Sequence, residues 1–212
     1  MPEGVKVNGK LRINGFRNGL AVEAFSYQLV ACRVSCLPPT VNRTLELTEC
    51  CLPDPIGDIR FGRNLVLDSC GQLDFAGKTH VVGELIVAPR SAIKIDATDA
   101  RFHGPLSIGG SLTMAHSVLE AKDGMEVGGN VDVRGGELSV TDRLAVEGNM
   151  RVNKSTLALP LAELSVDGDL SIQNTAVESW PDHMTVSGEM NVDIDLPLTA
   201  NSHATTSIPK PL

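Results

Sequence analysis

Apolar and polar residues alternate along this chain in phrases of nine residues, which return about every 20 residues. In LSVDGDLSIQ (164–173) the first, third, seventh and ninth residues are apolar, and a glycine occupies the fifth position. LAVEGNMRVN (144–153) and MTVSGEMNVD (184–193) repeat this arrangement. Strict alternation is typical of β-strands, and a glycine in the middle of the run indicates a corner between two short strands.

Ten such units can be counted along the chain. Their first residues are Val5, Glu23, Pro39, Ile59, Thr79, Leu106, Met125, Leu144, Leu164 and Met184. Of the 40 alternating slots in these units 37 are apolar, and the fifth slot is glycine in seven units. No window shows the i, i+3, i+4, i+7 spacing of an amphipathic helix. Because a unit of this size cannot bury its own apolar face, neighbouring units must stack on one another.

The repeat predicts an all-β fold, a parallel β-solenoid (β-helix) of about ten coils stacked at the strand spacing of ~4.8 Å. A leucine-rich-repeat-like solenoid is the alternative. We expect a single domain over residues 1–200, irregular at 14–38 and carrying an insertion at 88–105, followed by a disordered tail at 201–212. The twelfth residue of many units is small, which predicts a ladder inside the solenoid: Cys50, Cys70, Ser117, Gly136, Ser155 and Thr175.

Two bacterial families carry comparable repeats. The phrase L-x-V-x-G-x-L-x-V, with T-x-V-x-x-W-P at 175–181, resembles the 20-residue leucine-rich-like units of some type III secreted effectors. The spacing departs from the L-x-x-L-x-L of the leucine-rich family, and Thr175 or Ser155 replaces that family's buried asparagine. The Gly-Asn steps at 129–130 and 148–149 resemble those of bactofilins, which are polymer-forming bacterial β-helices. Neither resemblance brings a catalytic motif with it.

Composition narrows the function and the location. Apolar residues make up 42% of the chain and aromatic residues only 3%, which favours a narrow interior filled by branched aliphatic side chains. A net charge of −8 argues against a nucleic-acid partner or an anionic membrane surface. No apolar run approaches the roughly 18 residues of a membrane span, and the first residues lack the apolar core of a Sec signal. We therefore expect a cytoplasmic protein, or one exported without such a signal, including export into a host cell.

The five cysteines suggest reduced thiols, because their number is odd and no export signal precedes them. Cys50 and Cys70 occupy the same slot of adjacent units, and Cys36 and Cys51 have nearly equivalent places, so a zinc site deserves a test. There is no C-x-x-C pair, however, and the adjacent Cys50 and Cys51 point to opposite faces of a strand. The sequence favours buried free cysteines acting as small apolar residues, with no metal and no cofactor.

An enzyme is the third interpretation, since some carbohydrate-active enzymes are β-helices with acidic residues clustered on one face. The acids near the predicted insertion are Glu84, Asp96 and Asp99. The histidines fall in different slots and form no column: His80, His103, His116, His183 and His203. No catalytic residue is predicted from these sets.

The candidate partner-binding residues are Tyr27, Arg43 and Arg63, which replace glycine in the fifth slot of three consecutive units. We expect them to point outward, because an unpaired guanidinium buried among aliphatic side chains would cost several kcal/mol. Stacked side by side, they would form an aromatic and basic stripe suited to a protein partner. The alternative is that nearby acidic residues, such as Glu46, Glu49 or Asp58, merely neutralise the arginines.

Charge is distributed unevenly along the chain. Residues 161–198 contain eight acidic residues and no basic one, whereas residues 1–60 contain seven basic and six acidic residues. Opposite charges could favour head-to-tail stacking, but an acidic last coil around Asp193-Ile194-Asp195 also opposes edge-to-edge association. The sequence predicts a non-enzymatic protein-interaction or scaffold protein, including a bacterial secreted effector. The alternative is a self-assembling structural protein of the bactofilin type; a small-molecule substrate is not expected.

Overall fold

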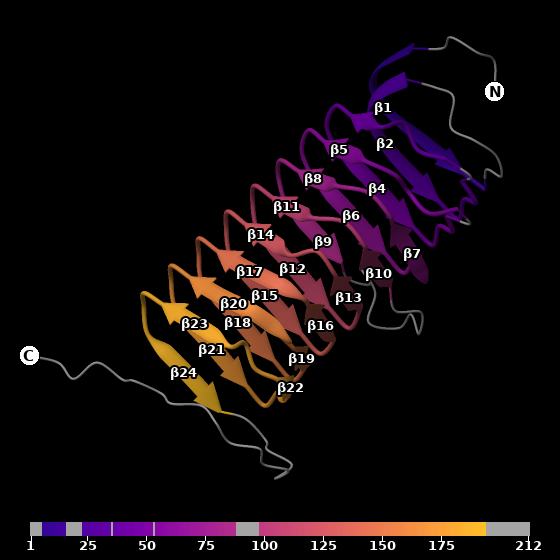
Figure 1. Ribbon diagram of the computed structural model, residues 1–212. Helices are drawn as coiled ribbons and strands as arrows, with labels where there is room; N and C mark the ends of the chain where they lie inside the picture. The colour runs from indigo at the N-terminus through magenta and orange to yellow at the C-terminus, as the bar shows by residue number, and fades with distance from the viewer. Residues whose placement is uncertain (1–5, 16–22, 35, 53, 88–97, 194–212) are drawn as a thin grey trace, which may run out of the picture.

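The computed structural model describes residues 6–15, 23–34, 36–52, 54–87 and 98–193, and in these ranges it contains strands and no helix. The strands form three parallel sheets along a rod of stacked coils, and one of these sheets runs from the first coil to the last (Figure 1). β1 and β24 lie at opposite ends of this rod. The predicted β-solenoid is therefore confirmed.

The sheet that we call sheet I has ten strands, one for each unit of the repeat. They are β1 (Lys6–Asn14), β2 (Glu23–Val30), β4 (Leu45–Thr48), β6 (Leu65–Asp68), β9 (Leu85–Val87), β12 (Leu112–Ala115), β15 (Val131–Arg134), β18 (Met150–Asn153), β21 (Leu170–Gln173) and β24 (Met190–Asp193).

Sheets II and III complete the coils. Sheet II has eight strands: β3 (Thr40–Val41), β5 (Ile59–Phe61), β8 (Thr79–Val81), β11 (Leu106–Ile108), β14 (Met125–Val127), β17 (Asp142–Val146), β20 (Leu161–Val166) and β23 (His183–Val186). Sheet III has six: β7 (Gln72–Phe75), β10 (Asp99–Phe102), β13 (Val118–Ala121), β16 (Glu137–Val140), β19 (Thr156–Ala158) and β22 (Ala176–Ser179). Within a coil the chain passes from sheet II to sheet I and then to sheet III.

The strand register confirms the predicted units from the third onward. Thr40 pairs with Arg60, which places Pro39 and Ile59 in one row, and this row continues through Thr79 and Leu106. The same row then passes through the first residues of the last four units. Like residues therefore lie above like residues, as a solenoid requires.

The register of the second unit differs from the prediction by two residues. Tyr27 pairs with Leu11 on one side and with Leu45 on the other, so it occupies the seventh slot rather than the fifth. A shift of two residues leaves the inward and outward alternation unchanged, and alternation alone cannot distinguish the two registers. The pairing of whole strands decides the register instead.

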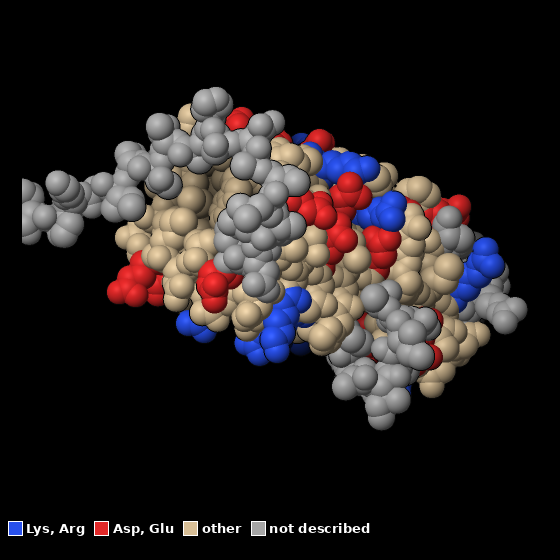
Figure 2. Space-filling view, turned by 90° about the horizontal axis from the view of Figure 1, so that it is seen from below, with Lys and Arg blue, Asp and Glu red and all other residues tan. Residues whose placement is uncertain are grey.

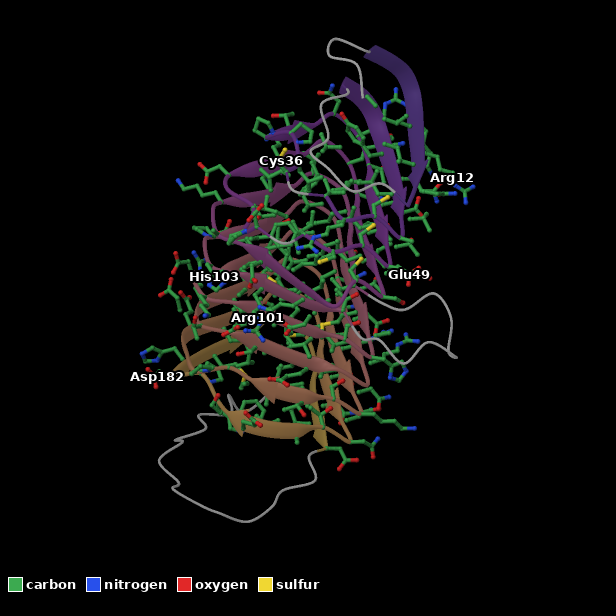
Figure 3. All side chains as sticks on the ribbon, turned by 90° about the vertical axis from the view of Figure 1, so that its right-hand side faces the viewer. Arg12, Cys36, Glu49, Arg101, His103 and Asp182 are labelled. Atoms are coloured by element: carbon green, nitrogen blue, oxygen red, sulfur yellow. The ribbon has the colours of Figure 1, made fainter. Side chains whose placement is uncertain are left out.

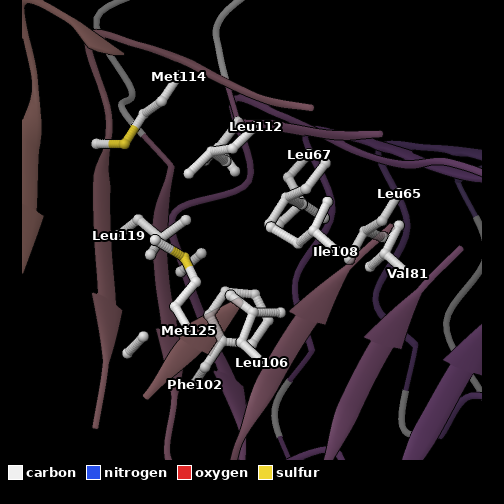
Figure 4. Close-up of a cluster of buried hydrophobic side chains, with 14 of the residues drawn as sticks. Leu65, Leu67, Val81, Phe102, Leu106, Ile108, Leu112, Met114, Leu119 and Met125 are labelled. Carbon is white, nitrogen blue, oxygen red and sulfur yellow. The ribbon is translucent and has the colours of Figure 1, made fainter. Parts of the chain in front are cut away.

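The interior is aliphatic, as its narrow width requires. The inward residues of the middle coils are fully buried, among them Leu106, Leu112 and Leu119 around Phe102 (Figure 4). Each such leucine stabilises the fold by about 1.5–3 kcal/mol relative to an exposed one. Phe75 and Phe102 stack with ring centroids 4.6 Å apart, which extends the core into sheet III.

The predicted insertion at 88–105 is too long at its C-terminal side. Residues 98–105 already belong to the regular coil, because Asp99 pairs with Gln72 of β7 and with Val118 of β13. Thr98 is fully buried, and its Oγ1 accepts a hydrogen bond of 3.1 Å from the backbone N–H of Cys70. Residues 88–97 lie outside the described residues, and so do residues 16–22 of the segment 14–38 that was predicted to be irregular, and the predicted tail 201–212.

The corner between sheets II and I explains the glycines of the fifth slot. A Cβ on Gly148 would lie 2.7 Å from the Gly129 carbonyl oxygen of the preceding coil, and one on Gly168 would lie 2.8 Å from the Gly148 oxygen. Glycine therefore lets successive coils approach closely at this corner. The next residue often provides a side-chain oxygen that accepts a backbone N–H of the following coil, as Asn64, Ser111, Asn130, Asn149 and Asp169 do.

The corner between sheets I and III has a different construction. The eleventh residue of most coils has a positive φ: Ala31, Glu49, Ser69, His116, Gly135, Lys154 and Asn174. The turn points the twelfth side chain inward, so the predicted internal ladder is present. Ser117, Ser155 and Thr175 donate hydrogen bonds of 2.8–2.9 Å to the carbonyl two residues earlier. These bonds satisfy hydroxyl groups that would otherwise be buried without a partner.

Candidate functional site

The structure separates the three residues predicted to form a partner-binding stripe. Tyr27 is only 2% exposed, and its hydroxyl accepts a hydrogen bond of 2.8 Å from the Ala24 backbone N–H. The prediction that Tyr27 points outward is therefore wrong, because the residue occupies an inward slot of β2. Arg43 and Arg63 are exposed at successive corners, where the Arg63 N–H donates to the Arg43 carbonyl at 2.8 Å. These two residues remain candidates for binding a partner.

A groove of about 660 Å³ follows the outer corner between sheets I and III. It spans four successive coils, and each coil contributes its eleventh residue: His116, Gly135, Lys154 and Asn174. The other wall carries the thirteenth residues, Val118, Glu137, Thr156 and Ala176. Gly135 and Gly136 place no side chain in the groove between His116 and Lys154. A Cβ on Gly135 would lie 2.7 Å from the His116 ring.

The groove carries polar groups on both walls. His116 and Lys154 are exposed, and so is Glu137 on the opposite wall. Hydroxyl and amide groups of Thr156 and Asn174 add hydrogen-bonding capacity. Sequence reasoning missed this groove, because its signal is the backbone conformation of the eleventh residue.

The outer face of sheet III carries interleaved charges. Arg101 makes a bidentate contact with Asp99, with Nη2 at 2.8 Å from Oδ2, and His103 Nε2 lies 3.5 Å from Asp74. The hydrogen bond with Asp99 raises the pKa of Arg101. Figure 2 shows acidic and basic side chains side by side on the face seen from below. Arg101 and His103 lie on the opposite side of the rod from Arg12 (Figure 3).

The acids considered for an enzyme are not assembled in one place. Asp99 lies on sheet III in its contact with Arg101, whereas Glu84 lies at the corner between sheets II and I. Asp96 is outside the described residues. A second hollow of about 310 Å³ surrounds Gly124 and contains Asp123, Asp142 and Arg143. Arg143 lies 3.9 Å from Glu126 and 3.7 Å from Glu163, so it offsets part of the negative charge there.

The cysteines divide into an inner and an outer group. Cys32, Cys50 and Cys70 are buried in the twelfth slot of successive coils, where each thiol donates to the carbonyl two residues earlier. Burial raises the pKa of Cys50 from 9.0 to about 12 and that of Cys70 to about 11. Cys36 and Cys51 are exposed. Within the described ranges, no group of three or more His, Cys, Asp or Glu side chains is placed to hold a metal ion.

The C-terminal end of the rod leaves apolar side chains uncovered. Met190 is 48% exposed, although Leu170, the residue beside it in the same row of sheet I, is fully buried. Trp180 is 37% exposed, and Met184, Val186 and Val192 are only partly buried. These side chains occupy the inward slots of a coil that has no further coil beyond it in the described chain. The end is therefore an apolar surface with three strand edges.

Comparison of the chain with family models, with curated proteins and with solved structures finds no match. The part of the chain that the structure describes also contains no helix of the length and apolar character needed to cross a bilayer.

Proposed function

We propose that this chain is a non-enzymatic protein-interaction or scaffold protein, which binds a partner protein on the outside of the solenoid. The observation that carries the proposal is the groove between sheets I and III, which presents His116 and Lys154 on either side of a glycine. The interior is filled by aliphatic side chains, so recognition falls to the outer surface. The resemblance to secreted effectors supports a bacterial source, with a cytoplasmic location or export without a Sec signal.

The groove favours an extended segment of a partner that carries a carboxylate or another negative group. Lys154 makes no ion pair within the described residues, and its side chain can therefore bind such a group at little cost. Ser117 and Ser155 form the floor with their hydroxyls turned into the solenoid, which leaves backbone and small side chains facing the partner. Arg43 and Arg63 provide a second basic position near the other end of the rod.

The experiment is a quantitative capture of partner proteins by wild type and by matched variants. Lys154→Glu reverses the charge inside the groove, whereas Arg151→Glu reverses an exposed charge of the same coil on sheet I, outside the groove. We expect a specific partner to bind wild type and Arg151→Glu and to be lost with Lys154→Glu. Arg43→Ala/Arg63→Ala tests the second position separately. Equal recovery of every protein by wild type and Lys154→Glu would remove the groove from consideration.

Self-assembly is the second candidate function, and the uncovered C-terminal end favours it. The last coil of a solenoid has to be capped or polar to prevent association, because its exposed strand edges can pair with strands of other molecules. Here the last described coil exposes Met190 and Trp180 instead. Light scattering at increasing concentration distinguishes the two functions: a discrete species supports the interaction protein, and growing filaments support self-assembly.

A further inference from the structure

The edge of sheet I at the C-terminal end is ready to accept another parallel strand. The Leu170 N–H donates to the Glu189 carbonyl, and the Asn174 N–H donates to the Asp193 carbonyl. In a parallel ladder alternate residues bond to opposite neighbours. The backbone groups of Met190 and Val192 therefore point away from β21, toward the free edge of β24. No strand of the described chain lies against that edge.

The other edge of the same sheet is β1, and its free groups have the complementary spacing. Gly15 donates its N–H to the Val30 carbonyl, so the backbone groups of Leu11 and Ile13 face β2. The backbone groups of Lys10, Arg12 and Asn14 consequently point outward. If β24 paired with β1 in the common register of sheet I, the free backbone groups of Met190 and Val192 would meet those of Lys10, Arg12 and Asn14.

The side-chain rows of sheet I also continue across such a joint. One inward row runs from Leu11 through Tyr27 and Leu45 to Leu170 and Met190. A second runs from Ile13 through Leu29 and Leu47 to Ile172 and Val192. If β1 of a second copy lay on β24, Leu11 would cover Met190 and Ile13 would cover Val192. The joint would then bury the exposed apolar side chains of β24 within the two inward rows of sheet I.

The charges of the two ends select this orientation. The exposed carboxylates of the last described coil are Glu178, Asp182, Glu189 and Asp193, and His183 is exposed beside them. β1 presents Lys10 and Arg12, which are both exposed, although Lys10 Nζ also lies 3.0 Å from Glu46 Oε2 of β4. Two C-terminal ends facing each other would oppose like charges, whereas a C-terminal end facing β1 brings Glu189 to Lys10 and Asp193 close to Arg12.

We propose that a second copy of this chain docks on the C-terminal end, with its β1 added to β24 as the next parallel strand of sheet I. The joint repeats from copy to copy, so it generates a head-to-tail filament rather than a closed dimer. This inference rests on self-assembly, the second candidate function, and specifies the surfaces that would perform it.

The test follows Trp180, which is the only tryptophan in the chain and lies in the end coil. We expect light scattering to rise with wild-type concentration and the tryptophan emission to shift to the blue as the end is covered. Val192→Pro removes a free-edge N–H without removing a bond to β21 and should abolish growth. Val192→Ala is the matched control, because it keeps the N–H and loses only side-chain contact; it should still associate.

Charge reversal tests which surfaces meet. Asp193→Arg alone and Arg12→Asp alone should each weaken association about tenfold, and an equimolar mixture of the two variants should restore it. If wild type grows but neither variant affects growth, the proposed joint is wrong although self-assembly stands. If full-length protein stays monomeric with constant emission, while a chain ending at Asp193 associates, residues 194–212 are the occupant and the inference fails. A monomer in both cases overturns self-assembly and leaves the groove proposal untouched.

Discussion

Asn130 joins two neighbouring coils, since its side-chain Oδ1 accepts a hydrogen bond of 2.8 Å from the backbone N–H of Asn149. Asn149 in turn accepts one of 2.8 Å from Asp169, and Asp169 accepts one of 2.9 Å from Glu189. This ladder stands beside the glycine column, where the coils come closest. It satisfies backbone groups at a corner that the sheets themselves leave unpaired.

We predict that Asn130→Ala destabilises the protein by about 1 kcal/mol, because the Asn149 N–H loses its partner and is left to water. Denaturant unfolding followed by circular dichroism measures the change. Asn153→Ala is the control, since Asn153 is exposed and its side chain makes no hydrogen bond within the described residues. A loss for Asn153→Ala as large as that for Asn130→Ala would contradict the role of the ladder.

The glycines of the same corner should tolerate no side chain. Gly168→Ala would place a Cβ against the Asn149 side-chain oxygen and 2.8 Å from the Gly148 carbonyl oxygen, so one coil must move. We expect a loss of about 2–4 kcal/mol, within the range of overpacked or strained sites. Gly57→Ala, where a Cβ has no atom within 4 Å, should change the midpoint of unfolding very little. Similar midpoints for both variants would rule out close packing at the corner.

Removing the buried hydroxyl of Thr79 should increase the stability of the protein. Thr79 is 1% exposed, and its Oγ1 has no hydrogen-bond partner among the described residues. Thr79→Val keeps the shape and should stabilise the protein by about 1 kcal/mol, because an unsatisfied polar atom is replaced by a methyl group. The matched variant is Thr175→Val, which loses the 2.8 Å bond to the Gln173 carbonyl and should destabilise. Thermal unfolding of both variants must give shifts of opposite sign.

The inner cysteines should make stability fall at alkaline pH. Cys50 and Cys70 bind their protons up to about pH 12 and 11 in the folded state, but only to about 9.0 in the unfolded state. Between these values the unfolded state holds fewer protons, so the free energy of unfolding decreases as pH rises. Cys50→Ser/Cys70→Ser should make this decrease smaller, because it removes the two thiols that titrate. The fold should tolerate the change, since serine already occupies the twelfth slot at Ser117 and Ser155. If the double variant showed the same decrease as wild type between pH 9.0 and about pH 11, the burial of these thiols would be contradicted.

Alternation along the chain was enough to predict the solenoid, because the side-chain period of a strand is 2 and the units repeat it in nearly every slot. It could not fix the register of Tyr27. The second unit has no glycine to mark its corner, and a two-residue shift keeps the strand residues on the same face while it moves Tyr27 from the inward seventh slot to the fifth slot at the corner. The error moved a buried tyrosine to the surface and produced a stripe that does not exist.

The groove at His116 and Lys154 depends on backbone geometry that residue types reveal poorly. Positive φ is common for glycine and asparagine, yet the eleventh position also holds Glu49, His116 and Lys154. The stacked coils impose this conformation on whichever residue is present. The exposure of Met190 could not be predicted for a different reason. Met190 belongs to the same alternating pattern as Leu170 and differs only in that no described coil lies beyond it.

The stacking of coils can be measured directly by the distances between spin labels placed in one outward row of sheet I. Thr48 and Arg134 are four strands apart in this sheet, and Thr48 and Gln173 are six strands apart. At the strand spacing of parallel sheets, the backbone separations should be about 19 Å and about 29 Å. Pulsed dipolar electron paramagnetic resonance should give two narrow distance distributions, whose centres differ by about two strand spacings. Broad distributions, or a Thr48–Gln173 distance no longer than the Thr48–Arg134 distance, would contradict the solenoid on which both proposed functions depend.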